Sequence, residues 1–321
     1  MGKVMVSIVC STYNHENYIA EAIDSFLMQK TNFKFEILIH DDASTDRTTD
    51  IIKEYERKYP ELVKPIYQTE NQYSKGIKVG KFNRERAKGK YVAICEGDDY
   101  WTDPYKLQKQ VEYMNAHPEC CMCVHAAYKV DANNQKLKKY VRPNIGNKIY
   151  TVEEIIKGGG GLFATNSIIY PRKICIDKVP FYKDAPVGDY PTVIYLALQG
   201  SVYYIDEFMS VYRKGVRGSW SVRINENTKK RVEHKKLIEK MLNKIDQYTN
   251  YNYTDVIQDM IIKNQFEVKL IQKQFKDLKT GKYKKIYDSL SNKEKIKINI
   301  KQYFPNIEKV IKIVRGKYYE K

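Results

Sequence analysis

Apolar residues in the first hundred positions alternate between short continuous runs and regularly spaced repeats. Val4 to Cys10 is an apolar run interrupted only by one serine, which is typical of a strand buried on both faces. Apolar side chains then recur every three or four positions from Ile19 to Leu27, the period of an amphipathic helix. The same alternation continues and predicts strands at 35–39, 63–67 and 91–95, and helices from the Ser44–Asp46 cluster to Tyr59 and over 78–88.

This alternation of strands and helices predicts an α/β fold, in which a mostly parallel sheet is flanked by helices. Its site is expected at the carboxyl ends of the strands. Beyond Trp101 the pattern predicts helices at 106–117, 151–157 and 190–199, and strands at 120–130, 166–170, 201–205 and 209–212. From Asn225 the sequence is rich in Lys, Ile and Tyr and helical throughout, so we expect one domain over 1–224 and a basic helical region over 225–321.

The net charge of +17 is concentrated in that C-terminal region, where 24 Lys and Arg stand against 12 Asp and Glu. Such an excess suits an anionic membrane face, a nucleic acid or an acidic substrate, and a solvated helical face explains it equally well. No nucleic-acid-binding motif accompanies it, so nucleic acid is the least favoured partner. Isoleucines and valines interleave with lysines from Ile296 to Val314, a pattern that favours attachment to an anionic membrane or to a protein partner.

Six cysteines occur without a disulfide framework or a CxxC metal spacing, which favours buried thiols in a reducing compartment. No apolar segment approaches the roughly 20 residues that a spanning helix needs. We therefore expect a cytoplasmic protein, with peripheral attachment to the inner face of the plasma membrane through the basic region.

Two acidic clusters follow two different predicted strands. Asp41 and Asp42 come after the second strand, and Glu96, Asp98 and Asp99 come after the fourth. Gathering carboxylates at one sheet edge costs electrostatic repulsion, which a bound Mg²⁺ or Mn²⁺ with its phosphate ligands would offset. A helix cap is the simpler interpretation of residues 41–46, but a cap needs only one such side chain.

Other nucleotide-binding and hydrolytic classes lack their motifs in this sequence. There is no GxxxxGK[ST] phosphate loop, and the first strand-to-helix turn, at residues 11–14, has none of the glycines of GxGxxG. None of the five histidines lies near a GxSxG-type nucleophile turn, which argues against a Ser-His-Asp hydrolase.

Several stretches, taken in order, resemble the successive motifs of family 2 glycosyltransferases with the GT-A fold. They are Val6–Asn14, Ile37–Asp46, and Ala87–Tyr91 leading into Glu96–Trp101. The resemblance covers roughly the first 105 residues and continues more weakly to about residue 221.

The resemblance implies roles for the acidic clusters and for the end of the first strand. The positions that would hold the nucleobase and ribose of a donor are Thr12, Tyr13, Asp41, Asp42 and Asp98. Asp99 matches the acid that holds the metal on the donor diphosphate, and Glu96 takes a supporting role.

The resemblance also implies a catalytic base and further binding positions. Asp189, within Pro186–Pro191, matches the acid that deprotonates the acceptor, although a helix cap before Pro191 explains it too and Gly188 stands where relatives often have Glu. Arg213 would bind the diphosphate, assisted by Lys214 and Arg217; a histidine that many relatives carry nearby is missing, which leaves the strictness of metal dependence open. Trp101 would wall the acceptor site, with core packing as the alternative.

The resemblance therefore implies a metal-dependent, inverting glycosyltransferase. It would move a sugar from a nucleotide-sugar donor, with UDP the expected nucleotide, to a hydroxyl of a glycan, lipid-linked or protein-linked acceptor in cell-surface polysaccharide or glycoconjugate biosynthesis. The alternative is a sugar-nucleotide-binding module without catalysis, which would keep the donor-binding acids.

The basic C-terminal region generates the first prediction. Full-length protein should float with anionic liposomes, and a chain that ends near Trp220 should not, because most of the excess positive charge is removed. A liposome flotation assay measures this, and equal flotation of the two chains would contradict membrane attachment through the basic region.

Overall fold

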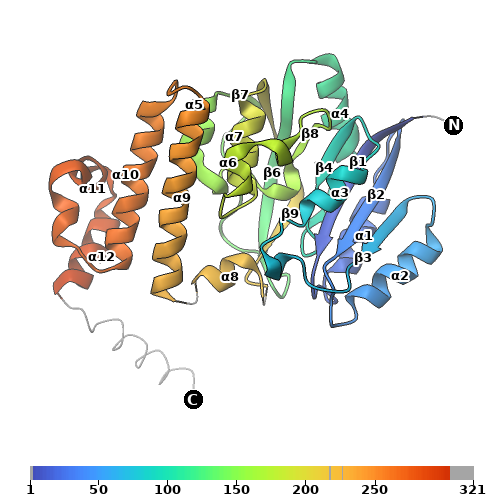
Figure 1. Cartoon of the computed structure of the whole chain (residues 1–321), viewed down its shortest axis with the longest axis horizontal. Coiled ribbons are helices and arrows are strands. Elements are labelled where there is room, and N and C mark those ends of the chain that lie inside the picture. The colour runs from blue at the N-terminus through green and yellow to red at the C-terminus, as the bar shows by residue number, and fades with distance from the viewer. Residues whose placement is uncertain (1–2, 217, 226, 304–321) are drawn as a thin grey trace. The chain divides into compact units, whose positions relative to one another are not determined.

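One mixed sheet of nine strands forms the centre of the N-terminal unit in the computed structural model, which describes residues 3–216, 218–225 and 227–303 (Figure 1). Its spatial order is β3-β2-β1-β4-β8-β6-β9-β5, and β7 pairs with β9. The strands are β1 (Val4–Thr12), β2 (Lys34–Asp41), β3 (Val63–Tyr67), β4 (Tyr91–Ile94), β5 (Tyr100–Trp101), β6 (Cys120–Asp131), β7 (Lys148–Tyr150), β8 (Ile169–Pro171) and β9 (Ser201–Lys214).

Helices flank this sheet, as the sequence pattern predicts (Figure 1). They are α1 (Ile19–Leu27), α2 (Thr48–Lys58), α3 (Gly80–Arg86), α4 (Lys106–Ala116), α5 (Val152–Gly158), α6 (Pro180–Lys183) and α7 (Asp189–Ala197). The helix predicted from the Ser44–Asp46 cluster is α2, which begins just beyond the cluster at Thr48; Asp46 accepts the backbone N–H of Thr48 at 2.9 Å, and Ser44 donates its hydroxyl to Asp41.

The sheet is mixed: β1 to β4 are parallel and so are β6 and β9, while the remaining pairs are antiparallel. β1, β2, β3 and β4 pair in parallel, whereas β8 is antiparallel to both β4 and β6, and β5 and β7 are antiparallel to β9. The α/β class is therefore confirmed, with a mixed rather than mostly parallel sheet. The two strands predicted at 201–205 and 209–212 are one strand, β9, whose pairing with β6 shifts register opposite His125–Ala127, so a bulge rather than a turn separates them.

Close packing fixes the strands that carry the acidic clusters. A Cβ atom on Gly89 would lie 2.5 Å from the backbone nitrogen of Ser7, so only glycine allows the turn before β4 to approach β1. On α1, Phe26 packs against Trp101 with ring centroids 4.9 Å apart.

All six cysteines are free thiols, and only Cys175 is exposed.

A second compact unit runs from Arg223 and is built from helices. The boundary between the two units lies within α8 (Trp220–Asn225). The helices that follow are α9 (Thr228–Tyr248), α10 (Thr254–Ile271), α11 (Lys284–Ser289) and α12 (Asn292–Tyr303). On α12, Ile298 is buried in a small core while Ile296 and Ile300 are exposed. The predicted amphipathic surface from residue 307 lies outside the described residues, and its membrane role stays a prediction. No described helix is long and apolar enough to cross a membrane.

Candidate active site

The end of β1 separates the two acidic clusters, which brings them to one edge of the sheet as predicted. The backbone N–H of Asp42 donates to the carbonyl of Thr12 at 3.0 Å, and that of Gly97 donates to the carbonyl of Ser11 at 3.0 Å. The loops after β2 and β4 are therefore attached to opposite sides of one strand end.

Asp41 and Asp42 are both buried and accept hydrogen bonds from neighbouring loops. Asp41 accepts hydrogen bonds from Ser44 and Thr49, which shape the turn into α2. The carboxylate of Asp42 accepts the backbone N–H groups of Gln72 at 2.8 Å and Tyr73 at 3.0 Å. Both carboxylates thus position loops at the predicted donor site, and direct contact with a donor stays a prediction.

A small polar niche lies around Gly97. The hydroxyl of Thr12 and Nδ1 of His15 are buried there and have no hydrogen-bond partner among the described residues. A Cβ atom on Gly97 would lie 2.7 Å from Thr12 Oγ1 and 3.1 Å from His15 Nδ1, so only glycine lets the loop after β4 approach these two side chains so closely. Tyr13, also predicted to bind the donor, is 42% exposed beside it. Unpaired buried polar atoms are costly, so the niche suits a polar ligand group.

The two adjacent aspartates after β4 have different surroundings. Asp99 is 3% exposed, and its carboxylate accepts the backbone N–H of Arg213 at 2.7 Å and the side-chain amide of Asn166 at 3.0 Å. Asp98 is 17% exposed, and no described group donates a hydrogen bond to its carboxylate; His15 Nε2 is 4.0 Å away. Asp98 is therefore the more accessible of the two carboxylates, and the metal role of Asp99 stays a prediction.

Glu96, which sequence reasoning gave a supporting role, lies two positions before Asp98 and is partly exposed. Burial, together with the nearby charges of Asp98 and Asp189, raises the pKa of Glu96 to about 7. Burial, followed by Asp98 and Glu96, also raises the pKa of Asp99. Glu96 and Asp98 are thus a pair of carboxylates that repel each other beside the polar niche.

Arg213 does not occupy the position predicted for it. Its side chain is fully buried and donates to Glu21 at 2.6 Å, to the carbonyl of Asp98 at 2.8 Å and to Asn134. The guanidinium also lies 4.5 Å from the ring centroid of Tyr18. The prediction of a diphosphate contact is therefore wrong for this structure, since these contacts occupy the group inside the protein. Lys214 is exposed, and Arg217 lies outside the described residues.

Trp101 is also not where the resemblance implied. It is 1% exposed, packs on Phe26 and donates its indole N–H to the carbonyl of Asn166 at 2.8 Å. Lys106 Nζ lies 4.0 Å from its ring centroid on the inner side. The acceptor-wall prediction is wrong, and the alternative of core packing is confirmed.

Asp189 is the first residue of α7 and is partly buried. One carboxylate oxygen accepts the adjacent backbone N–H of Tyr190 at 2.7 Å, but the residue before the helix is Gly188 and no side chain caps α7, so the cap alternative is not confirmed. Burial raises the pKa of Asp189. Within the glycine run, a Cβ atom on Gly160 would lie 3.5 Å from the other oxygen, which places the run beside this carboxylate.

Lys78 holds the turn that leads into Asp189. Its ammonium donates to the carbonyls of Ala185 at 3.0 Å and Val187 at 3.1 Å, and it lies 4.3 Å from the ring centroid of Tyr182. Burial lowers the pKa of Lys78 to about 8. Lys78 ends the same loop whose start is held by Asp42, so one loop joins the two predicted parts of the site.

Tyr212 lies close to the carboxylates of both parts of the site. Burial raises its pKa, and four carboxylates add to the rise, those of Asp99, Glu96, Asp98 and Asp189. The acids after β4 and the acid that begins α7 therefore lie within electrostatic range of one side chain. The sequence did not predict the roles of His15, Lys78 and Asn166. A local signal existed for Glu96, because its spacing to Asp98 is that of a D-x-D pair.

A family model described as Glycosyl transferase family 2 matches residues 7–170, which is about half of the chain. An uncharacterised protein of Mycobacterium tuberculosis is 39% identical over 220 residues, 67% of this chain and 60% of that one. A Bacillus subtilis protein named for teichuronic acid biosynthesis is 40% identical over 113 residues, 35% of this chain and 42% of its own. The chain thus spans well under two thirds of the length of these relatives.

Two solved structures share the fold. Residues 1–349 of Staphylococcus aureus TarS, in complex with UDP-GlcNAc, superpose with a TM-score of 0.57 at 16% identity, covering 92% of this chain and 78% of that chain. The mannosyltransferase PcManGT of Pyrobaculum calidifontis, in complex with GDP-Man and Mn²⁺, has a TM-score of 0.59 at 14% identity, with coverage of 94% and 88%. At these identities the likeness establishes the fold, which is that of GT-A glycosyltransferases.

The contacts of Arg213 generate a prediction. Arg213→Lys keeps the charge but loses the forked contacts to Glu21, Asn134 and the Asp98 carbonyl, so the free energy of unfolding should fall by about 2 kcal/mol in urea titration. Lys214→Ala, at the exposed next position of β9, is the control and should change it by less than about 0.5 kcal/mol. Unchanged stability of Arg213→Lys combined with a raised donor KM would instead favour the original diphosphate role.

Proposed function

Because this chain belongs to glycosyl transferase family 2, we propose that it transfers a sugar from a nucleotide-sugar donor to an acceptor hydroxyl. The observation that carries the proposal is the gathering of acids beside buried polar atoms without a described partner: the Asp98 carboxylate lies 4.0 Å from His15 Nε2, and Thr12 Oγ1 and His15 Nδ1 have no described hydrogen-bond partner. Glu96 is close enough to both Asp98 and Asp189 for their charges to raise its pKa. Donor groups on one side and a carboxylate base on the other are what displacement at an anomeric carbon requires.

The donor side is formed by the ends of β1, β2 and β4. Thr12 and His15 each keep a buried polar atom without a described partner, and the exposed ring of Tyr13 lies next to them. These groups suit the base and ribose of a nucleotide. Asp41 and Asp42 take part by holding the loops that enclose this space.

The carboxylates after β4 fit a divalent cation by their chemistry. Glu96 and Asp98 are hard oxygen ligands, and Asp98 accepts no hydrogen bond from a described group. We therefore assign the cation to Asp98 with Glu96 beside it, in place of Asp99. When bound, Mn²⁺ or Mg²⁺ would stabilise the negative charge that develops on the departing nucleoside diphosphate. Asp99 positions the loop after β4 through its hydrogen bonds to Arg213 and Asn166.

Asp189 is the proposed base. Only one of its oxygens accepts a backbone N–H at the start of α7. Its raised pKa is closer to neutral pH than that of an ordinary aspartate, which makes it a better proton acceptor. Attack by the deprotonated acceptor on the face opposite the leaving group inverts the anomeric centre. Lys78 keeps the preceding turn in place through its two carbonyl contacts and so positions the base.

The relatives and neighbours support the substrate class. TarS was solved with UDP-GlcNAc and PcManGT with GDP-Man, and one relative is named for teichuronic acid biosynthesis. We propose a UDP-sugar as donor and a glycan, lipid-linked or protein-linked acceptor in cell-surface polysaccharide or glycoconjugate biosynthesis at the cytoplasmic side of the membrane. A non-catalytic binding module has the same donor side but no use for the base at Asp189.

The base assignment generates a prediction. In a panel of nucleotide sugars with Mn²⁺, the protein should release nucleoside diphosphate from one donor, and Asp189→Asn should lower kcat by about 10²–10⁴-fold. Donor affinity should change little. Because the pKa of Asp189 is raised, activity should be lost as the pH falls through a value above that of an ordinary aspartate.

The matched control for Asp189→Asn is Glu153→Gln, which removes an exposed carboxylate from the first turn of α5. It should leave kcat and the pH profile unchanged. Full activity of Asp189→Asn would overturn Asp189 as the base. No turnover of any donor by the wild-type protein would favour the binding-module alternative.

The two aspartates after β4 generate a paired prediction. Asp98→Asn should abolish Mn²⁺ binding measured by calorimetry in the presence of UDP, with little change in stability, because its carboxylate has no described donor. Asp99→Asn should keep Mn²⁺ binding but lose about 1–3 kcal/mol of unfolding free energy, since an amide NH₂ would face an N–H donor. The reverse pattern would restore Asp99 as the metal ligand.

A further inference from the structure

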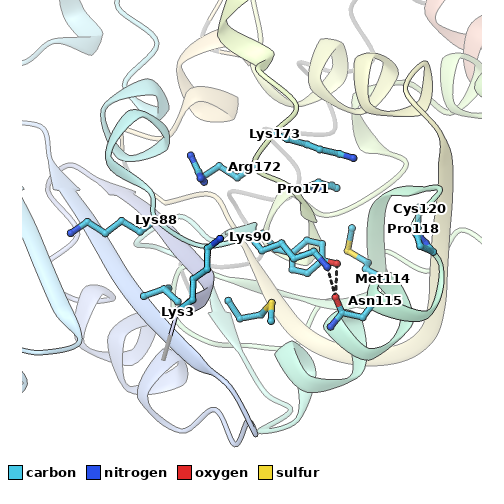
Figure 2. Close-up of a pocket in the computed structure, with 13 residues that line it drawn as sticks. Lys3, Lys88, Lys90, Met114, Asn115, Pro118, Cys120, Pro171, Arg172 and Lys173 are labelled. Carbon is cyan, nitrogen blue, oxygen red and sulfur yellow. Dashed lines mark hydrogen bonds between the residues drawn. The ribbon is translucent and has the colours of Figure 1, made fainter. Parts of the chain in front are cut away.

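A cavity lies at the amino ends of β1 and β4, the edge of the sheet opposite the acidic clusters. Figure 2 shows the residues that line it. Its volume is about 420 Å³, within the range of small-molecule sites. The end of α4, the start of β6 and the residues after β8 complete its walls. β4 connects the two sites, because Tyr91 at its start lines the cavity and Glu96 follows its end.

The charge around this cavity is of one sign. Five basic residues line it, namely Lys3, Lys88, Lys90, Arg172 and Lys173, and no acidic residue is among the lining residues (Figure 2). None of the five forms an ion pair with a carboxylate in the described part of the chain. Like charges around one hollow raise its positive potential, so an anion bound there would relieve their repulsion.

Two of these cations are held in place rather than free in solvent. Lys90 Nζ and the hydroxyl of Tyr91 both donate to Oδ1 of Asn115, at 2.6 and 2.9 Å (Figure 2). The guanidinium of Arg172 donates from Nε to the carbonyl of Gly89 at 2.8 Å. Because these side chains are already oriented, binding an anion would cost less conformational entropy than at an ordinary lysine surface.

The inner wall of the cavity is apolar. Val4, Met5 and Pro118 line it and keep part of their surface accessible, whereas Tyr91 and Met114 are each only 2% exposed. A purely ionic ligand such as inorganic phosphate would leave the accessible apolar side chains in water. The occupant that matches both surfaces has an anionic head and an apolar part.

We propose that this cavity binds a phosphate ester that carries an apolar group. The basic rim holds the phosphate oxygens through charge-assisted hydrogen bonds, and the apolar wall covers the hydrocarbon. The same chemistry is offered by the headgroup of an anionic membrane lipid and by a free phosphate ester. This site is separate from the proposed catalytic space, so its test does not depend on finding the sugar donor.

The experiment uses full-length protein and calorimetric titration with three probes: n-hexyl phosphate, inorganic phosphate and hexanol. Hexyl phosphate should bind about tenfold or more tightly than inorganic phosphate, because part of its chain leaves water, and hexanol should not bind measurably. Equal affinity for hexyl phosphate and inorganic phosphate, or no binding of either, would overturn the proposal.

Two variants locate the binding. Asn115→Asp keeps the acceptor for Lys90 and Tyr91, so the fold is preserved, but it places a carboxylate in the cavity and should weaken hexyl phosphate about tenfold. Lys3→Ala/Lys90→Ala/Lys173→Ala should abolish binding. The matched control is Lys136→Ala/Lys138→Ala/Lys139→Ala, which removes three exposed charges elsewhere and should change nothing. Equal loss in the control would show non-specific attraction and overturn the site.

Vesicles distinguish the two sources of the ligand. If the site takes a lipid headgroup, Asn115→Asp should lower sedimentation of the full chain with phosphatidylglycerol vesicles and leave phosphatidylcholine vesicles unaffected. If hexyl phosphate binding is lost while vesicle binding is unchanged, the ligand is a free phosphate ester.

Discussion

The buried carboxylate of Asp99 is the contact on which the candidate site depends. A charge removed from water is costly unless hydrogen bonds replace its hydration, and here the backbone of Arg213 and the side chain of Asn166 supply them. These donors come from β9 and from the segment before β8, so one carboxylate ties the loop after β4 to two distant parts of the sheet. With Asp99 fixed inward, the preceding Asp98 remains accessible.

The basic groups nearest the acids also hold distant parts of the chain together. Arg213 lies beneath the acidic loop and contacts Glu21 and the carbonyl of Asp98, and Lys78 holds the carbonyls that precede Asp189. Both cations are engaged in holding backbone in place, and the charge of Lys78 only partly offsets the rise that burial causes in the pKa of Asp189. Glu96, Asp98 and Asp189 therefore keep an excess of negative charge that a cation can relieve, and this suits a site for a metal-bound diphosphate.

The part of this arrangement that depends on local pattern was predictable from sequence. Apolar runs and helical periods identified β1 to β4 and their helices, and the sheet topology brought Asp42 and Gly97 to opposite sides of β1 as expected. Which acid faces inward was not predictable, because the side-chain alternation of β4 ends at Ile94 and a loop follows. The partners that decide it, Asn166 and Arg213, are 67 and 114 positions from Asp99.

The opposite edges of the parallel strands carry opposite charge, and the helices offer a physical reason. A helix that returns from one parallel strand to the next begins at the carboxyl edge and ends at the amino edge, so its unpaired carbonyls and negative dipole end lie at the amino edge. The end of α3 leads directly into Lys88, and the end of α4 contributes Asn115 to the basic cavity. Cations gathered there are favoured by the helix ends even without a ligand. Helix ends alone do not explain the accessible apolar side chains of Val4, Met5 and Pro118, and these are the feature that calls for an occupant with a hydrocarbon part.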